Sequence, residues 1–200
     1  QIFIDSMIDA GKKPLFDEYI NEAKALLDDG ILEGSDWEGR EECVRKTLDK
    51  ISRNICPSVT VSTMHGCPPK EIEAICSYLL TGKKLDTFVK LNPTLLGYDT
   101  VRKVLDDLGF NYVVLKRESF EHDLQLSDAK AMLHRLVELA GKEGRKFGVK
   151  LTNTLGNVNP QDVLPGDERY GSGRILLPLS TRVALILSEE FNGTLPISYS

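Results

Sequence analysis

The stretch "VSTMHGCPPKEIEAI", residues 61–75, decides the fold because it joins two elements of different kinds. A β-branched run over 59–63 is typical of a strand, and the apolar spacing over 70–80 is typical of a helix. Between these two elements the chain makes a short turn that contains His65 and Cys67. The sequence therefore predicts a strand that passes directly into a helix, with an imidazole and a thiol at the junction.

The same alternation of strand-like and helix-like segments continues to the C-terminus. The predicted strands are 59–63, 88–91, 112–115, 147–151 and 195–199. The predicted helices are 70–80, 100–108, a long helix capped by Ser127, and 179–190, the last following a Gly/Pro/Asn-rich loop over 155–178. Strands that alternate with helices indicate right-handed βαβ units and a buried parallel sheet. The pattern alone leaves open a doubly wound sheet or part of a (β/α)8 barrel.

The two parts of the chain differ in this rhythm. Residues 1–57 are predicted to be a helical segment, with one helix that begins near Pro14 and another that is capped by Ser35. Residues 58–200 are predicted to hold the βα units. The chain begins with Gln1 and stops inside a predicted strand, and we therefore expect a fragment of a longer protein.

Composition excludes several classes of protein. The net charge of −5 is spread over well-mixed signs, which makes nucleic acid an unfavourable partner. The sequence has no apolar run near the roughly 20 residues of a membrane span. Four cysteines without a CxxC pair predict neither a zinc ribbon nor an iron–sulfur cluster within the chain, and no metal site. We expect a cytoplasmic protein with reduced thiols.

Two lysines lie at the predicted strand ends, where parallel α/β folds gather their active groups. Lys90 and Lys150 are each the centre of a Val-Lys-Leu triplet. A lysine flanked by core residues points into a barrel interior or onto the helix-covered face, and burial there is costly unless an anion or a dipole is its partner. That partner is a flavin, a phosphate or a Schiff-base substrate; the plainer alternative is an internal salt bridge.

The order of motifs resembles the flavin-binding barrel of dihydroorotate and dihydropyrimidine dehydrogenases. The matching pieces are Cys67-Pro68, Val89-Lys90-Leu91-Asn92-Pro93, Asn153-Thr154, Gly171-Ser172-Gly173, Pro178 and Arg182. Over most of the chain, "STMHGCPPKEIEAIC", "TFVKLNPTLLGY" and "GVKLTNT" are similar to large bacterial iron–sulfur flavoproteins that carry the name selenate reductase subunit. These proteins are themselves similar to dihydropyrimidine dehydrogenase. The resemblance implies a (β/α)8 TIM-barrel-like flavin domain, present here as a partial barrel with extra N-terminal helices.

The resemblance also implies roles for residues at the strand ends. Cys67 matches the cysteine that gives a proton to, or takes one from, a substrate ring carbon, and His65 is placed to shift its ionisation. Lys90 and Lys150 match positions near the flavin, either FMN or FAD. The remaining candidates are cofactor-binding: Asn92 and Asn153 toward the ring or substrate, and Thr154, Ser172 and Gly173 on the phosphate side.

The implied activity is that of a flavin-dependent oxidoreductase. Electrons would pass from NAD(P)H through flavin to a small-molecule substrate, with NAD(P)H and 4Fe–4S modules in parts of the protein outside this chain. Other domains or subunits of a redox complex are then its partners. The chain departs from the dehydrogenase motif at Met64, Gly66 and Pro69, where those enzymes have Asn, Ser and Asn.

Two further interpretations stay open beside the flavin one. The first is a Schiff-base, aldolase-type barrel, which would use Lys150 as its nucleophile. The second is a non-catalytic barrel that only scaffolds the redox modules, and the departures from the dehydrogenase motif favour it.

Overall fold

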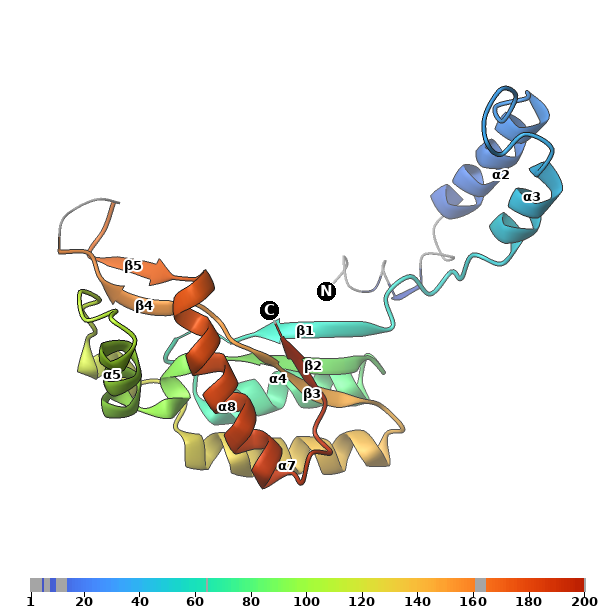
Figure 1. Cartoon of the computed structure of the whole chain (residues 1–200). Coiled ribbons are helices and arrows are strands. Elements are labelled where there is room, and N and C mark those ends of the chain that lie inside the picture. The colour runs from blue at the N-terminus through green and yellow to red at the C-terminus, as the bar shows by residue number, and fades with distance from the viewer. Residues whose placement is uncertain (1–4, 6–7, 10–13, 64, 161–164, 200) are drawn as a thin grey trace. The chain divides into compact units, whose positions relative to one another are not determined.

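The computed structural model describes residues 5, 8–9, 14–63, 65–160 and 165–199 (Figure 1). The chain divides into two compact units, Gln1–Pro57 and Ser58–Ser200. In the first unit, helix α2 (Pro14–Asp28) packs against helix α3 (Glu41–Asp49). Lys24 on α2 pairs with Asp49 at the end of α3 at 2.5 Å, so the two helices are joined by charge as well as by packing.

The predicted cap of the second N-terminal helix is wrong. Ser35 lies in a turn ahead of α3, where its Oγ donates to the carbonyl of Leu32 and accepts from the N–H of Trp37. The residue that precedes α3 is Arg40, whose side chain makes no capping bond. Ser35 therefore stabilises the turn, because short hydroxyl side chains bond as readily to turn backbone as to helix ends.

The second unit contains a four-stranded sheet in the order β1-β2-β3-β6, and every neighbouring pair is parallel. This confirms the predicted α/β class. The strands are β1 (Ser58–Ser62), β2 (Asp86–Leu91), β3 (Phe147–Leu151) and β6 (Ile197–Tyr199). The α-helices are α4 (Pro69–Thr81), α5 (Tyr98–Asp107), α6 (Arg117–Glu121), α7 (Leu126–Lys142) and α8 (Leu176–Glu190), with short 3-10 helices η2 (Pro93–Leu96) and η3 (Gly173–Ile175).

The two faces of the sheet have different surroundings. Val89, Leu91, Val149 and Leu151 are fully buried on the face that packs against helices, with α4 against β2 and both α7 and α8 against β3 (Figure 1). Residues on the opposite face are exposed or half-buried in β1 and β2. We call this second side the open face, and it is the side that a closed barrel turns inward.

A glycine on the open face is fixed by close packing. A Cβ on Gly148 would lie 2.5 Å from the carbonyl oxygen of Pro196 and 2.6 Å from the ring of Phe88. Phe88 is opposite Gly148 in the register of β2 and β3. The ring therefore covers the glycine, and any larger residue would displace the ring or the chain before β6.

One predicted strand and one predicted loop are wrong. Residues 112–115 form no strand, and β2 pairs directly with β3. Val113 and Leu115 are buried, and the carbonyl of Val114 accepts from the N–H of Val158 at 2.8 Å. The segment therefore packs beside a hairpin that the sequence did not predict, in which β4 (Leu155–Val158) pairs antiparallel with β5 (Glu168–Gly171).

The helix predictions are right in place and imprecise at their ends. Helix α7 begins at Leu126, so Ser127 lies inside the helix and the cap position is Gln125. Helix α8 begins at Leu176, ahead of the predicted start. Apolar periodicity marks the body of a helix well, but its first turn depends on local contacts such as those of the Gln125 side chain with the carbonyls of Phe120 and Asp123.

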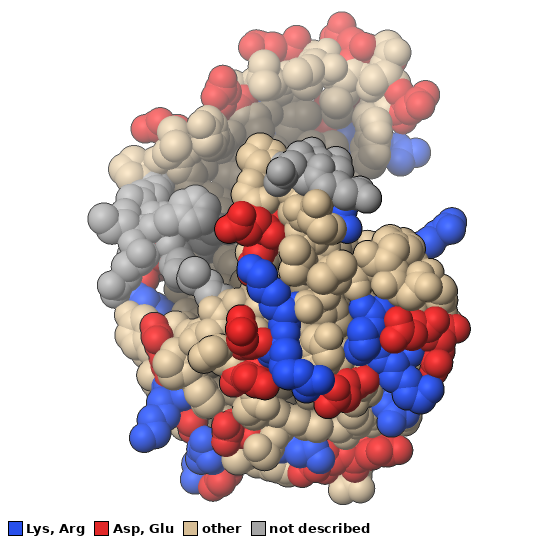
Figure 2. Space-filling view, turned by 90° about the vertical axis from the view of Figure 1, so that its left-hand side faces the viewer, with Lys and Arg blue, Asp and Glu red and all other residues tan. Residues whose placement is uncertain are grey.

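The described residues contain no helix both long and apolar enough to cross a bilayer. In the lower part of the face drawn in Figure 2, lysine and arginine side chains are interspersed with aspartate and glutamate side chains.

Candidate active site at the strand ends

Two predicted residues meet where β2 and β3 end. The side-chain amide of Asn153 donates to Oδ1 of Asn92 at 2.7 Å and to the carbonyl of Thr63 at 3.1 Å. Oδ1 of Asn153 accepts from the hydroxyl of Ser62 at 3.1 Å. Because parallel strands end at one edge, asparagines that follow different strands in the sequence become neighbours in space.

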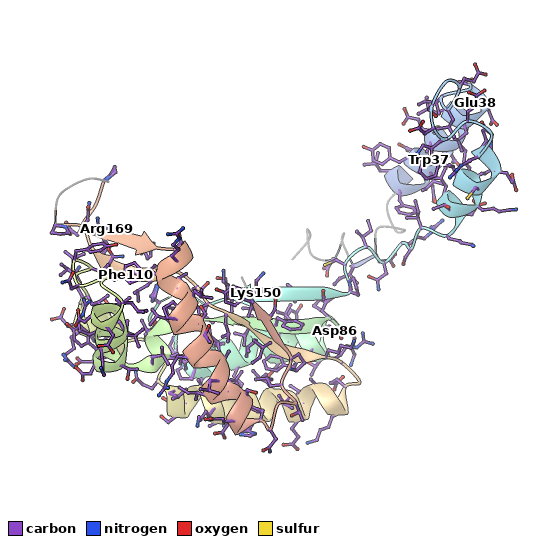
Figure 3. All side chains as sticks on the ribbon, viewed as in Figure 1. Trp37, Glu38, Asp86, Phe110, Lys150 and Arg169 are labelled. Atoms are coloured by element: carbon purple, nitrogen blue, oxygen red, sulfur yellow. The ribbon has the colours of Figure 1, made fainter. Side chains whose placement is uncertain are left out.

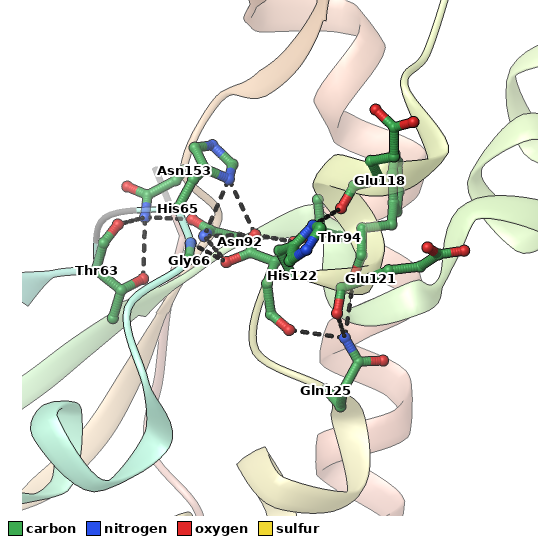
Figure 4. A network of polar contacts seen from close by, with 12 residues as sticks. Thr63, His65, Gly66, Asn92, Thr94, Glu118, Glu121, His122, Gln125 and Asn153 are labelled. Atoms are coloured by element: carbon green, nitrogen blue, oxygen red, sulfur yellow. Dashed lines mark hydrogen bonds and ion pairs between the residues drawn. The ribbon is translucent and has the colours of Figure 1, made fainter.

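The amide of Asn92 leads to a carboxylate that the sequence analysis missed. Asp123 is 5% exposed, and its carboxylate accepts hydrogen bonds from four residues (Figure 4). Its donors are Thr94 Oγ1 at 2.6 Å, His65 Nδ1 at 2.9 Å, Asn92 Nδ2 at 3.0 Å and the Gly66 backbone N–H at 3.1 Å. We call Asp123 and these donors the Asp123 cluster. It ties the β1–α4 turn to the end of β2.

The cluster shifts the ionisation of both of its titratable members. Burial by itself raises the pKa of Asp123, but the hydrogen bonds from His65, Thr94, Gly66 and Asn92 outweigh it and lower that pKa to about 2. The hydrogen bond to Asp123 raises the pKa of His65; burial opposes this shift, and the charges of Asp123 and Glu168 add to it. At neutral pH Asp123 is therefore a carboxylate, and His65 Nδ1 donates to it.

The linker between α6 and α7 holds Asp123 in place. Phe120 is 4% exposed and meets the ring of Tyr98 edge-on at 5.5 Å. The Gln125 amide donates to the carbonyl of Phe120 at 2.9 Å and to that of Asp123 at 2.7 Å. In the sequence, Asp123 stands between His122 and Leu124 in a segment without strand or helix periodicity, and no sequence pattern marks it.

His65 also borders a cavity of about 260 Å³. The residues around it include His65, Thr94, Ser119, His122, Glu168 and Tyr170. The rings of His65 and Tyr170 are 6.3 Å apart and inclined by 24°. Glu168 pairs with Lys116 at 3.1 Å on the same side. We call this the Tyr170 cavity; the hairpin β4–β5 forms part of its wall.

Cys67 lies on the other side of the same turn. It is half-buried against the core and borders a second cavity of about 360 Å³ together with Ser62, Glu71 and Ile75; His65 and Gly66 line this cavity as well as the Tyr170 cavity. Burial raises the pKa of the Cys67 thiol, and the charges of Glu71 and Asp123 raise it further. The thiol form therefore predominates at neutral pH, so Cys67 is suited to give a proton rather than to act as a thiolate.

The two predicted lysines are neighbours on the open face. Lys90 lies directly opposite Lys150 in the pairing of β2 and β3, and Ser62 and Ser198 extend the same row on either side. Lys150 lies on the side of the sheet away from α7 (Figure 3). Within the part of the chain that the structure describes, neither ammonium group belongs to an ion pair. We call these four residues the lysine row.

Lys90 is one of the residues that line a cavity of about 530 Å³. Its lining includes Lys90, Thr154, Ser172, Gly173, Arg174 and Tyr199. Four of these are predicted cofactor-binding residues; Arg174 is a cation that the sequence analysis did not select. Gly173 has φ of +70°, a conformation that favours glycine, and it begins η3 just ahead of α8. We call this the Lys90 cavity.

The structure thus separates the predicted residues into three places. Asn92 and Asn153 join the hydrogen-bonded strand ends, and Lys90 lines the Lys90 cavity with Thr154, Ser172 and Gly173. Lys150 lies beside Lys90 in the register of β2 and β3. Cys67 and His65 lie together on the β1–α4 turn and line a second cavity. Met64 is outside the described residues. Among the residues described, no three His, Cys, Asp or Glu side chains are grouped so as to hold a metal ion.

Comparisons with known proteins give a consistent result. A family model described as "Oxidoreductase YgfK, N-terminal TIM-barrel domain" matches residues 1–200. Two curated relatives, each called "Putative oxidoreductase YgfK", come from Escherichia coli K12 and Escherichia coli O157:H7. Each is 53% identical over 201 residues, which is all of this chain and 20% of the relative. No solved structure matches the chain.

Proposed function

The chain belongs to the family of YgfK oxidoreductase N-terminal TIM-barrel domains, and from this we propose that it binds a flavin at the lysine row and the Lys90 cavity. The family match confirms the TIM-barrel class and the oxidoreductase family that the sequence indicated. Flavin dependence, the substrate and the partners belong to the proposal, because the chain spans 20% of the relatives' length.

One observation supports the flavin above the rest. Lys90 and Lys150 are directly opposite each other, and like charges in that position repel. No carboxylate among the described residues pairs with either one. An anion bound over the pair would remove the repulsion, and a reduced flavin ring and a phosphate are both anions of suitable size for the neighbouring cavity.

The residues present fit such a group. The Lys90 cavity offers cationic Lys90 and Arg174, the hydroxyls of Thr154 and Ser172, and a glycine whose backbone can approach a phosphate closely. These are the donors that a flavin phosphate requires. A bound flavin would supply hydride transfer, and the protein would supply binding, orientation and electrostatics.

The chain's own residues then have separate tasks. The lysine row holds negative charge on the open face. Asn92 and Asn153 keep each other's amides oriented at the strand ends, since Oδ1 of Asn92 is fixed by Asn153 and its Nδ2 by Asp123. Proton transfer falls to Cys67 or to His65, the two titratable groups of the β1–α4 turn.

For the longer protein, we propose the organisation that the resemblance implies. NAD(P)H and 4Fe–4S modules outside this chain would exchange electrons with the flavin, and a small molecule would be the substrate. Kinship with selenate reductase-like and dihydropyrimidine dehydrogenase-like flavoproteins, and a cytoplasmic location, belong to the same proposal. Other domains or subunits of the redox complex would be the partners of this domain.

Flavin content of the full-length protein tests the proposal. We expect an oxidised-flavin absorbance band and release of FMN or FAD on denaturation. Changing Lys90→Met and Lys150→Met together should weaken flavin binding by about tenfold or more, since each tenfold corresponds to about 1.4 kcal/mol of lost charge interaction. Lys103→Met, which removes an exposed lysine of α5, is the matched control and should retain flavin.

Two outcomes would contradict the flavin assignment. A full-length protein that carries FAD elsewhere, with the same flavin content in the double variant, would favour a scaffold barrel. Trapping of a carbonyl compound on Lys150 by borohydride would favour Schiff-base chemistry.

A further inference from the structure

We propose that the Tyr170 cavity is an acid–base site, in which Nε2 of His65 exchanges a proton with a compact neutral or cationic ligand and Asp123 is the positioning residue. This inference rests on the proposed function in one respect only: it gives the proton-transfer task of that site to His65 and not to Cys67.

The orientation of the imidazole is the first argument. Asp123 Oδ2 accepts from Nδ1 at 2.9 Å, and Asn92 Nδ2 lies 3.5 Å from the same nitrogen. Figure 4 shows both contacts reaching one nitrogen of the ring. Nε2, on the opposite side of the imidazole, is therefore directed away from the cluster. A carboxylate that fixes Nδ1–H makes Nε2 the basic nitrogen, which is the arrangement of histidine general bases.

The rigidity of Asp123 is the second argument. Thr94, Gly66 and Asn92 hold the carboxylate from three other directions, and its side chain is 1% exposed. His65, in contrast, is 36% exposed at its side chain. A fixed buried carboxylate beneath a partly exposed imidazole lets the ring gain or lose a proton without rearranging the cluster.

The cavity itself indicates the class of ligand. At about 260 Å³ it lies just below the roughly 300–1,000 Å³ typical of drug-sized sites, so it takes a compact molecule. Phe120 and Tyr170 provide aromatic surface, while Ser119 and Thr94 provide hydroxyls.

The charged and titratable groups that face His65 come from every neighbouring element. They are Asp123 before α7, His122 after α6, and Glu168 and Tyr170 on β5. Cys67 and Glu71 line the second cavity that His65 borders. Two carboxylates against one imidazolium disfavour a ligand that enters as an anion, and Lys116 pairs with one of them, Glu168. An anion formed in the site from a neutral ligand is matched by the imidazolium formed in the same transfer, so the net charge of the site does not change. We therefore infer a neutral or cationic ligand that bears an acidic O–H or N–H group.

The proton balance needs no further reactant. The ligand's O–H or N–H bond breaks, its electron pair stays on the ligand, and the proton forms the N–H bond of Nε2. His65 becomes an imidazolium whose charge Asp123 compensates, and Nδ1–H remains donated to Asp123 throughout. The reverse transfer restores the starting state.

Carbethoxylation of histidines in the full-length protein tests the orientation of His65. Diethylpyrocarbonate attacks the unprotonated imidazole nitrogen, and mass spectrometry follows each histidine over a pH series. We expect the His65 curve to inflect above 6.5, and Asp123→Asn to move that inflection downward and to speed modification several-fold at neutral pH. His134 on α7 is the internal control, and its rate should be the same in both proteins.

A cavity-filling variant tests where Nε2 points. Ser119→Phe should protect His65 from the reagent, while Ser77→Phe on α4 serves as the matched control and should not. Equal His65 modification in the two variants would place Nε2 outside the cavity and overturn the proposal. An unchanged inflection in Asp123→Asn would overturn the role of Asp123.

The transfer itself is tested with para-nitrophenol, a compact neutral aromatic whose absorbance reports loss of its O–H proton. With the full-length protein we expect the bound phenol to show the phenolate band at a pH where the free phenol does not. His65→Gln should abolish this band and Cys67→Ser should retain it. The opposite pattern, or no band in the unchanged protein, would overturn the assignment. Flavin content of the same samples reports separately on the proposed function.

Discussion

The lysine row and the Asp123 cluster both lie near the carboxyl ends of the strands of one sheet, but different interactions hold their residues in place. Lys90 and Lys150 are held by register: each is one position in a strand, and parallel pairing makes them neighbours. Asp123 is held by hydrogen bonds from donors that lie up to 58 residues away in the sequence. Among the described residues no carboxylate pairs with either lysine of the row, whereas Asp123 accepts hydrogen bonds from four donors. The lysine row is therefore suited to bind an anion, and the Asp123 cluster is suited to orient another side chain.

The largest effect is expected for Asp123→Ala, which removes the carboxylate that distinguishes the Asp123 cluster from the lysine row. The change leaves His65, Asn92, Thr94 and the Gly66 N–H without their common acceptor. Removing one partner of a buried charged network costs about 3–5 kcal/mol. Hydrogen exchange of the segments at the ends of β1 and β2 should show this loss in the full-length protein. Asp99→Ala, which removes an exposed partner of Arg117, is the control and should leave exchange in those segments unchanged.

Packing on the open face gives the second test. Gly148→Ala should destabilise the β3–β6 region by about 1–3 kcal/mol, because the added Cβ overlaps the Pro196 carbonyl and the Phe88 ring. Gly156→Ala is matched, since its Cβ would lie 3.8 Å from Tyr170, an ordinary contact. Equal exchange in the two variants would mean that Phe88 does not rest on Gly148.

Acid titration sharpens the contrast between the two regions. The pKa of Asp123 is lowered to about 2 from an ordinary 3.8, so its contribution is fully present above that ordinary value and is lost as pH falls toward 2. The linked stability is on the order of 2 kcal/mol. Exchange at the strand ends should therefore accelerate in this acid window, and Asp123→Asn should remove the pH dependence. The His65 contribution has the opposite sign: it is present below 6.5 and is lost as pH rises through its raised pKa.

The smallest effect is expected at Cys67. Cys67→Ser should leave strand-end exchange nearly unchanged, because no hydrogen bond of the cluster involves the sulfur. Alkylation at neutral pH should be slower at Cys67 than at exposed Cys43, since the raised pKa keeps Cys67 as a thiol. Faster alkylation of Cys67 would show a nucleophilic thiolate there and restore it as a reactive group.

The sequence predicted those features that follow from periodicity. Strands β1, β2, β3 and β6 and their helices follow from alternation of apolar residues, and Lys90 beside Lys150 follows from two similar triplets in parallel strands. The segment 112–115 has the same composition as a strand but lies against the β4–β5 hairpin. Composition alone does not specify which backbone a buried extended segment will pair with.

The missed parts of the site depend on irregular backbone. Asp123 lies in a linker fixed by Phe120 and Gln125, and Tyr170 lies on a hairpin inside a segment predicted as a loop. Neither position belongs to a repeating pattern, so no periodicity marks it. Cys67 was selected because it matched a motif, and the structure gives it a cavity apart from the lysines.

The Asn153 side chain has a consequence for the order of assembly. Its amide donates hydrogen bonds to the carbonyl of Thr63, which lies 90 residues earlier in the sequence, and to Oδ1 of Asn92, which lies 61 residues earlier. Such distant contacts come at a high entropic cost and form slowly. During synthesis, β1, α4 and β2 therefore emerge before the contacts of Asn153 with their strand ends can form. These contacts form only after β3 has left the ribosome and paired with β2.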